Sequence, residues 1–184
     1  MSNISRRIFL AYLGILLASI SANATAQLIK KFRKSNVTII SSGQIFTFNI
    51  ELAEDSKQHA LGLMYRQKLA PDAGMLFDYK TPHRISMWMK NTFIPLDMIF
   101  IAADGRIVNI AERTIPKSTT VISSHENVKA VLEVNSGTVA KLGIKPGDLV
   151  RHRIFEWILS AHFLNELETI VDGDYGEIYA GVLF

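Results

Sequence analysis

The sequence predicts a mainly β, α+β domain: a compact, mostly antiparallel sheet or barrel-like fold with two short helices, followed by a C-terminal amphipathic helix. Six or more short apolar segments alternate with turn residues over positions 37–155, a spacing typical of antiparallel sheets rather than of alternating βαβ units. Hydrophobic residues make up 48% of the chain and cysteine is absent, so the core must stabilise the fold without disulfides. Residues 156–184 change to a helical repeat of apolar positions.

The first half of the domain is predicted to contain a hairpin, a helix and two further strands. The predicted strands are residues 37–40, 45–52, 75–79 and 84–92. The turn at 41–43 makes the first two strands a hairpin. Asp55 or Ser56 can cap a short helix that runs to about Tyr65. A Pro-Asp-Ala-Gly turn at 71–74 then leads back into the sheet.

The second half is predicted to return through four more strands and one short helix. The predicted strands are residues 96–101, 106–111, 128–134 and 149–155. Asp104-Gly105 is a strong signal for a two-residue hairpin turn. Ser136 or Thr138 can begin a helix that ends near Leu142.

The N-terminus is typical of a cleavable export signal. Arg6-Arg7 precedes an uncharged apolar run at 8–20, and Ala24 and Ala26 occupy the small-residue positions of a cleavage site. The apolar run is too short for a comfortable membrane span. We therefore expect a signal peptide over residues 1–26, export by either the general or the twin-arginine route, and a periplasmic or secreted protein without a stable membrane span.

The charge distribution argues against a nucleic-acid partner. The whole chain carries a formal charge of +3, but residues 27–155 hold 18 basic and 11 acidic side chains, whereas residues 156–184 hold six acids and no Lys or Arg. Part of the basic excess lies in a predicted flexible leader at 27–36, in which Phe32 is the one interleaved aromatic residue, too few for a base-stacking platform. The acidic tail is predicted to form a helix that packs on its own domain or on a partner.

The sequence contains no familiar catalytic or cofactor motif. It has no G-x-S-x-G elbow and no glycine-rich phosphate loop, and its five histidines lack metal-ligand spacing. We therefore expect no cofactor and assign no catalytic residue from a motif. The unusual residues are concentrated between positions 62 and 97.

Four blocks in that stretch resemble one family. They are Gly62-Leu63-Met64-Tyr65-Arg66, Gly74-Met75-Leu76-Phe77, Met87-Trp88-Met89-Lys90-Asn91-Thr92 and Ile94-Pro95-Leu96-Asp97. Together with matching segments at 131–137 and 142–148, they resemble an uncharacterised conserved family of small exported prokaryotic proteins, over residues 37–155. The resemblance implies a single compact β-rich domain and no established activity. Met87 replaces the phenylalanine common in that family, and the tail at 156–184 extends beyond it.

Five side chains in these blocks are candidate ligand-binding residues: Arg66, Trp88, Lys90, Asn91 and Asp97. On a strand, Trp88 and Lys90 would share one face, an arrangement that suits a cleft for a glycan or another polar small molecule. The alternative interpretation is that Trp88 fills the core while Lys90 extends past it to solvent. The cluster has no nucleophile–base pair, which favours an envelope binding or accessory module over an enzyme.

Two carboxylates in apolar strands are interpreted differently. Asp97 is expected to be buried and to need a partner, such as Arg66, Lys90 or a backbone donor. If these groups converged in a cleft, Asp97 could serve as the base of an envelope hydrolase, with Lys90 or Arg66 stabilising charge. Glu133 lies between Leu132 and Val134 and is expected to point to solvent.

A methionine-based copper site is the remaining alternative. The mature chain has five methionines between positions 64 and 98, and thioethers bind monovalent copper. Met87 and Met89 are the candidate ligands. Each methionine also lies in an apolar segment, so the interpretation we prefer is that they fill the core and that the domain holds no metal.

Overall fold

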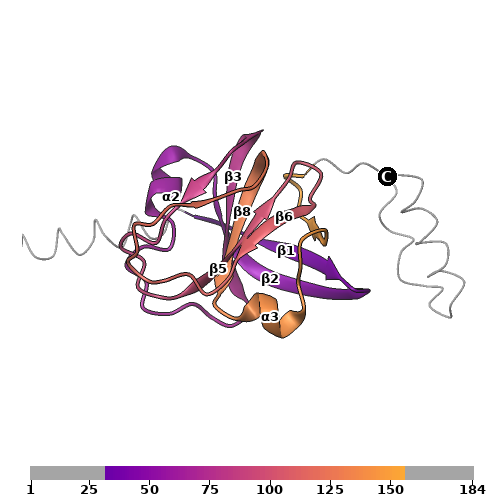
Figure 1. The fold of residues 1–184 in the computed structure, drawn as a ribbon, viewed down its shortest axis with the longest axis horizontal. Helices are drawn as coiled ribbons and strands as arrows, with labels where there is room; N and C mark the ends of the chain where they lie inside the picture. Colours follow the sequence, from indigo (N-terminus) through magenta and orange to yellow (C-terminus); the bar gives the residue numbers. More distant parts are fainter. Residues whose placement is uncertain (1–31, 156–184) are drawn as a thin grey trace, which may run out of the picture.

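The computed structural model describes residues 32–155, which form one curled sheet, a two-stranded sheet and two short helices (Figure 1). The large sheet has the strand order β6-β5-β8-β3-β2-β1-β9. Its strands are β1 (Arg33–Ser41), β2 (Gln44–Ala53), β3 (Ala73–His83), β5 (Leu96–Ile101), β6 (Ile107–Ala111), β8 (Val128–Asn135) and β9 (Leu149–Arg151). The small sheet pairs β4 (Ser86–Met87) with β7 (Ile122–Ser123).

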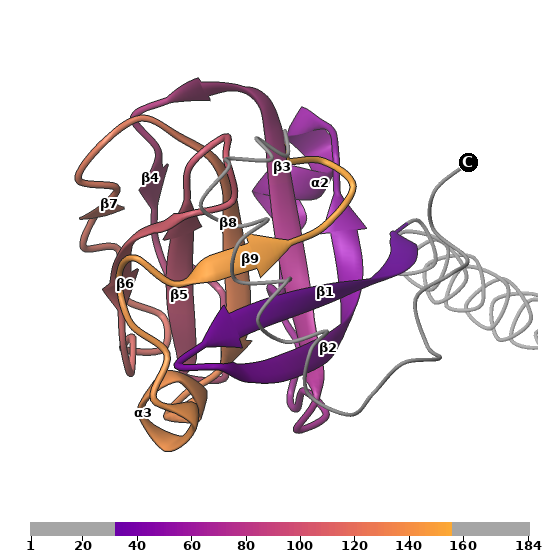
Figure 2. The same cartoon turned by 90° about the vertical axis from the view of Figure 1, so that its right-hand side faces the viewer.

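The predicted fold class is confirmed. Every strand pair is antiparallel except β2–β3, which is parallel and is connected through the helix α2 (Ser56–Leu61). The second helix, α3 (Thr138–Leu142), lies at the opposite end of the sheet in Figures 1 and 2. Among the described residues, no helix has the length and apolar character needed to cross a membrane.

The sheet curls until its two edges meet, giving a half-barrel (Figure 2). β9 pairs with β1 on one side, and a bridge between Arg106 and Leu149 connects it to the segment before β6 on the other. The amide of Val150 donates to the carbonyl of Gly105 over 2.8 Å. Gly105 has φ of 86°, and a Cβ there would lie 2.5 Å from the Val150 oxygen. Only glycine permits this approach, and the Asp104-Gly105 turn predicted from the sequence is therefore part of the closure.

The prediction of a flexible leader over residues 27–36 is wrong for residues 33–36, which belong to a strand. β1 begins at Arg33, which is paired with Leu52 in the β1–β2 hairpin. A strand pairs through its backbone, so exposed basic side chains do not prevent this segment from forming one strand of the hairpin. Arg33 also forms an ion pair with Glu54. The hairpin itself, with its turn after Ser41, is confirmed.

The strand predicted over 84–92 is wrong for most of its length. β4 covers only two residues, and the chain then forms a turn in which the Thr92 amide donates to the Met89 carbonyl over 3.0 Å. Asn91 adopts φ of 58°, a left-handed conformation that ends a strand. The apolar residues of this segment pack on the sheet from outside, so their sequence pattern resembles that of a strand.

The predicted helices are shorter than their sequence pattern. Asp55 caps α2 as expected, accepting a hydrogen bond from the Gln58 amide over 2.9 Å. The helix then ends at Gly62, four residues before Arg66, because Gly62 adopts φ of 47°. β9 likewise ends at Arg151. The amphipathic helix predicted beyond residue 155 lies outside the described residues.

Two hydrophobic clusters occupy the two faces of the sheet. Side chains alternate between faces along a strand, and in β8 Leu132 and Val134 belong to the inner cluster of the half-barrel. Val131 of the same strand belongs to a second cluster with Phe77, which α2 and the 84–94 segment cover from outside. Because β8 is buried on both faces, it has no solvent side, and its acidic residue, Glu133, is buried as well.

Candidate functional site

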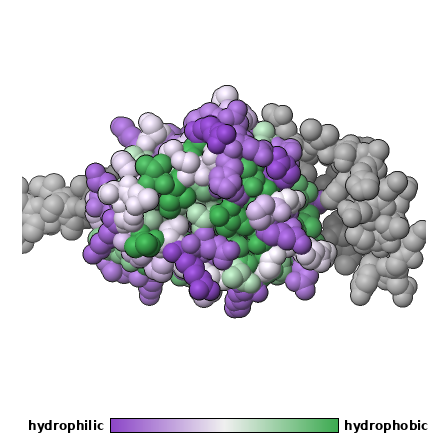
Figure 3. Space-filling model, viewed as in Figure 1, coloured by the Kyte–Doolittle hydropathy of each residue, from purple (hydrophilic) through white to green (hydrophobic). Residues whose placement is uncertain are grey.

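The predicted site residues are divided between three environments rather than gathered in one cleft. Trp88 and Lys90 lie together in the turn after β4, with the Lys90 ammonium nitrogen 5.5 Å from the centre of the Trp88 ring. Trp88 is 51% exposed, so the alternative that it fills the core is wrong. Within residues 32–155 it is one of four large apolar side chains outside the β1–β2 hairpin that are at least half exposed, with Tyr65, Ile115 and Val121. On the face in Figure 3, apolar residues form small patches separated by hydrophilic side chains.

Asp97 is fully buried in β5 and is bound by backbone donors. Its two carboxylate oxygens accept hydrogen bonds from the Arg113 amide over 2.8 Å and from the Val139 amide over 3.0 Å. The carboxylate thus joins the loop after β6 to the first turn of α3. The expected burial with a backbone donor is confirmed, and neither Arg66 nor Lys90 contributes to this arrangement.

Arg66 is engaged elsewhere. Its guanidinium makes two hydrogen bonds to the carboxylate of Glu51 on β2, at 2.8 and 2.6 Å, and lies 6.0 Å from the centre of the Phe32 ring. Such a two-point pair fixes the segment after α2 against β2. Arg66 is therefore a structural partner of Glu51, although its positive charge still acts on the neighbouring pocket.

Asn91 connects the segment after α2 to the turn after β4. Its side-chain amide donates to the Tyr65 hydroxyl over 3.0 Å, and its carbonyl accepts from the Tyr65 amide over 2.9 Å. The Tyr65 ring in turn packs edge-on against Phe93 at 5.9 Å. Asn91 thus holds the segment after α2 beside the turn that carries Trp88, and the space between these two segments is a pocket.

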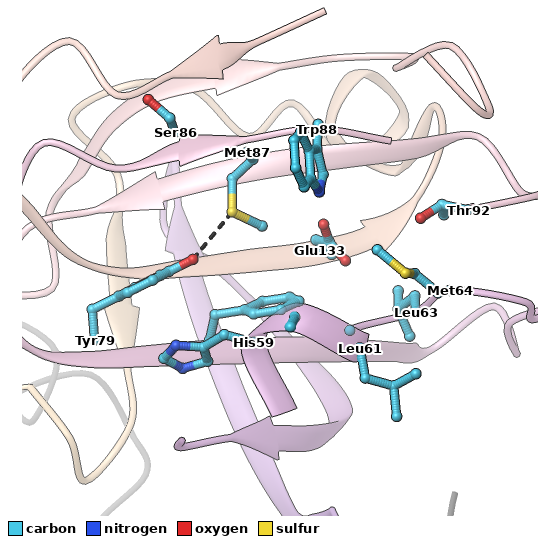
Figure 4. A pocket seen from close by; sticks show the side chains of 13 residues that line it. His59, Leu61, Leu63, Met64, Tyr79, Ser86, Met87, Trp88, Thr92 and Glu133 are labelled. Atoms are coloured by element: carbon cyan, nitrogen blue, oxygen red, sulfur yellow. Dashed lines mark hydrogen bonds between the residues drawn. The ribbon is translucent and has the colours of Figure 1, made fainter. Parts of the chain in front are cut away.

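The pocket has a volume of about 250 Å³ and lies on the outer face of the sheet, under Trp88 (Figure 4). Its lining comes from α2 and the segment after it, from β3, from β4 and the turn after it, and from β8. The lining residues are His59, Ala60, Leu61, Gly62, Leu63, Met64, Phe77, Tyr79, Ser86, Met87, Trp88, Thr92 and Glu133. Of the five predicted site residues, the structure places Trp88 in this lining.

Glu133 is the residue that the sequence interpretation missed. It is 4% exposed, and its carboxyl makes no hydrogen bond or ion pair with any described residue. Figure 4 shows the carboxyl in the space bounded by Trp88, Met64 and Thr92. Burial raises the pKa of Glu133 to about 8, against a smaller lowering by the charge of Arg66. The expectation that Glu133 points to solvent is wrong, because α2 and the 84–94 segment cover this face of β8.

Of the other polar side chains of the lining, Tyr79, His59 and Ser86 have partners among the described residues and Thr92 has none. The Tyr79 hydroxyl donates to the Met87 sulfur over 3.1 Å, and burial raises the pKa of Tyr79 above its ordinary value. The Thr92 hydroxyl has no hydrogen-bond partner within residues 32–155. The His59 ring contacts the Ala53 carbonyl at 3.1 Å and packs 4.5 Å from the Tyr79 ring.

The two candidate copper ligands are in different environments. Met87 lines the pocket, whereas Met89 is 1% exposed in the outer cluster and its sulfur accepts from the Thr114 hydroxyl over 3.2 Å. Met89 therefore fills the core, as preferred. Within residues 32–155 no group of three His, Cys, Asp or Glu side chains is placed to hold a metal ion.

A second depression, of about 560 Å³, runs along β1, β2 and the start of β3. Three of its polar side chains have partners outside the lining: Asn49 donates to Asp72 over 2.6 Å, Glu51 is paired with Arg66, and the Ser35 hydroxyl lies 3.0 Å from the His152 ring. Its charged side chains, Lys34 and Glu51, are not buried, whereas the pocket under Trp88 contains the buried carboxyl of Glu133. The pocket under Trp88 is therefore the stronger candidate site.

Comparisons with known proteins place this fold in a family. A model of the DUF192 family, described as "Uncharacterized ACR", matches residues 37–152. Two of the similar solved structures are a proposed transcription regulator from Sinorhizobium meliloti 1021 (48% identity, TM-score 0.64, 65% of this chain and 94% of that one covered) and a protein of unknown function from Novosphingobium aromaticivorans DSM 12444 (40% identity, TM-score 0.65, 66% and 86% covered). The comparison with curated proteins found no match.

Proposed function

The chain belongs to the uncharacterised DUF192 family, and from that premise we propose that it is an exported binding module of the cell envelope whose pocket under Trp88 takes a small polar molecule. The observation that supports this is the Glu133 carboxyl, which is buried, lacks a protein partner among the described residues and opens into the pocket. Burying a polar group without a hydrogen bond costs free energy. A ligand that bonds to it recovers that cost on binding.

The arrangement supports binding better than hydrolysis. Asp97, the candidate base, faces away from the pocket, since it is opposite Val134 in the β5–β8 register and Glu133 is opposite Met98. Its oxygens already accept from two backbone amides. Hydrolysis of a glycosidic bond generally uses two carboxyl groups, and the pocket lining contains one, Glu133. We therefore do not retain the hydrolase alternative with Asp97 as base and Lys90 or Arg66 stabilising charge.

The transcription-regulator description of the Sinorhizobium protein is not carried over to this chain. Contact with nucleic acid depends largely on Arg and Lys side chains that reach phosphate oxygens. The pocket lining contains neither residue type, and its one charged group is an acid. Its chemistry is thus the opposite of what a phosphate requires.

Export is proposed on sequence grounds, since the signal at residues 1–26 and the acidic tail at 156–184 lie outside the described residues. An exported domain without cysteine must be stabilised by its core, and the two clusters on the faces of the sheet provide such a core. N-terminal sequencing of the protein isolated from a periplasmic fraction tests this proposal. We expect Gln27 as the first residue; an intact N-terminus in a cytosolic fraction would contradict it.

Binding is tested through the fluorescence of Trp88. The chain has two tryptophans, Trp88 and Trp157, so the Trp157→Phe variant makes the signal report on the pocket. We would titrate it with D-glucose, N-acetylglucosamine and n-butylammonium, and follow backbone amide resonances of the pocket residues in parallel. At least one probe is expected to saturate with a signal centred on Trp88 and Thr92. If none perturbs the pocket, the proposed binding function is wrong.

A further inference from the structure

We propose that the ligand of the Trp88 pocket is a small organic ammonium ion, held by the Glu133 carboxylate at the base of the pocket and by the aromatic rings of its wall. This inference rests on the proposed binding function and adds the chemical class of the ligand. Four features of the pocket carry it: the unpartnered acid, the absence of Lys and Arg from the lining, the aromatic and thioether walls, and the volume.

The acid is the first feature. Glu133 is 4% exposed, faces the pocket and has no hydrogen-bond donor among residues 32–155. A buried carboxylate is stable only with donors or an opposite charge. A primary ammonium group supplies both, because it carries three N–H donors and a positive charge. The free hydroxyl of Thr92 lies in the same lining and can accept a second of these hydrogen bonds.

The absence of Lys and Arg from the lining is the second feature. None of the thirteen lining residues is Lys or Arg. Arg66 is close enough for its charge to lower the pKa of Glu133, yet its guanidinium is committed to Glu51 through two hydrogen bonds of 2.8 and 2.6 Å. A carboxylate or phosphate ligand would therefore meet Glu133 without a free cation in the lining to balance it.

The walls are the third feature. The rings of Trp88, Tyr79 and Phe77 and the sulfurs of Met64 and Met87 line the pocket, and both π faces and thioethers are rich in electrons. The Trp88 ring already lies 5.5 Å from the ammonium nitrogen of Lys90 on the outer surface. This distance is within the range of a cation–π contact, and the proposal adds a second cation on the pocket side of the ring.

The volume is the fourth feature. At about 250 Å³ the pocket is smaller than the roughly 300–1,000 Å³ of most small-molecule sites. This volume favours a small ligand, such as a short alkylammonium or an amino alcohol, over a disaccharide.

Binding should be coupled to the ionisation of Glu133. Burial raises the pKa of Glu133 to about 8, so the carboxyl is mostly protonated at pH 6. An ammonium ion favours the carboxylate, and its binding therefore releases a proton and tightens between pH 6 and pH 9. The titratable and charged side chains that face Glu133 in the described part of the chain are His59 of α2, Arg66 after α2 and Tyr79 of β3.

Three probes of one shape test the ligand class: n-butylammonium chloride, 1-butanol and sodium butyrate. Each is titrated at pH 8 into the full-length Trp157→Phe variant, with Trp88 fluorescence and amide resonances as readouts. We expect n-butylammonium to bind at least tenfold more tightly than 1-butanol and butyrate. If 1-butanol or butyrate binds in the pocket as tightly as n-butylammonium, the ligand class is wrong while the binding function stands.

Two variants test the role of the acid. Glu133→Gln is expected to weaken n-butylammonium binding at least tenfold at pH 8 and to abolish its pH dependence. Glu126→Gln is the matched control, because Glu126 is an exposed partner of Arg106 at the half-barrel closure; it should leave affinity unchanged. Equal affinity for wild type and Glu133→Gln would overturn the proposal. Should none of these probes or the sugars perturb Trp88, the binding function and this inference both fall.

Discussion

Asp97 and Glu133 are both buried carboxyl groups on neighbouring strands, yet the fold treats them in opposite ways. Asp97 faces the inner side of the half-barrel and accepts hydrogen bonds from two backbone amides, of Arg113 and Val139. Glu133 faces the outer side, has no hydrogen-bond partner among the described residues, and opens into a pocket. Burial alone therefore does not mark a functional acid; burial without a partner does.

The difference separates structure from function within one sheet. The Asp97 carboxylate satisfies backbone donors that would otherwise be buried unpaired, so it stabilises the loop after β6 and the start of α3. Glu133 satisfies nothing in the described protein and costs stability when it ionises. Natural proteins retain such destabilising groups mainly at functional sites. The following changes test this contrast, from the largest expected effect to the smallest.

Removing Asp97 should have the largest effect. Asp97→Ala leaves the Arg113 and Val139 amides without an acceptor, and hydrogen bonds to charged groups contribute about 1.5–3 kcal/mol each. We expect a loss of about 3–5 kcal/mol in the free energy of unfolding, measured by urea denaturation. Asp97→Asn, which keeps one acceptor oxygen, should lose less. A loss below 1 kcal/mol in both variants would show that the carboxylate is not a structural clamp.

Glu133→Gln should raise the free energy of unfolding at alkaline pH, whereas the Asp97 variants lower it. In the folded protein Glu133 keeps its proton up to its raised pKa of about 8, whereas its ordinary value is 4.5. The folded state therefore binds more protons between these values, and the free energy of unfolding falls as pH rises through that window. A tenfold change in a proton-binding constant corresponds to about 1.4 kcal/mol. Relative to Glu133→Gln, the wild type should lose on the order of 3 kcal/mol from pH 5 to pH 8.

The measurement is urea denaturation of wild type and Glu133→Gln at both pH values, with Glu126→Gln carried as a control for loss of an exposed acid. Parallel pH profiles for the wild type and Glu133→Gln would mean that Glu133 ionises normally in the folded state. The unpartnered carboxyl would then not be the feature that distinguishes the two acids.

Replacing Arg66 should have a smaller effect with two parts. Arg66→Met breaks a partly exposed pair with Glu51, which is worth about 1 kcal/mol at most. It also removes the charge that lowers the pKa of Glu133, so that pKa should rise further. Lys90→Met, which removes an exposed charge outside the pocket lining, is the control and should change neither quantity. Side-chain carboxyl resonances report the pKa, and an unchanged Glu133 titration in Arg66→Met would contradict this link.

Replacing Trp88 should have the smallest effect on stability. Trp88 is 51% exposed, and substitutions of exposed side chains usually change the free energy of unfolding by less than about 0.5 kcal/mol. Trp88→Ala should nevertheless abolish saturable n-butylammonium binding, which amide resonances of Thr92 and Glu133 would report. Retained affinity in Trp88→Ala would remove the ring from the site, while a large stability loss would reassign it to the core.

The sequence predicted the strands in which apolar and polar residues alternate, or in which apolar residues follow one another. The strand prediction was wrong where apolar residues pack onto the sheet from outside. Residues 84–92 have the composition of a strand, but they fold as two strand residues and a turn that covers the outer cluster. The proximity of Trp88 and Lys90 was predicted from a shared strand face. It arises instead from a turn in which Asn91 has positive φ.

The candidate site was predictable in part. Asp97 was expected to be buried with a backbone donor, and the structure confirms it. Glu133 carried a signal that was misinterpreted: Ala130, Val131, Leu132 and Val134 make β8 apolar on both faces, which indicates a strand without a solvent side. The grouping of Glu133 with Trp88 could not have been predicted, because it depends on where the segment after β4 folds back over the sheet.

The most direct test of this account is a pH titration of the Glu133 side-chain carboxyl resonance, assigned by its loss in Glu133→Gln, with and without n-butylammonium. The account predicts a midpoint near the raised pKa of about 8 in the free protein and a lower midpoint with the ligand bound. A midpoint near the ordinary value of 4.5 in the free protein, unchanged by the ligand, would contradict the claim that Glu133 is a buried acid without a protein partner that binds an ammonium ion.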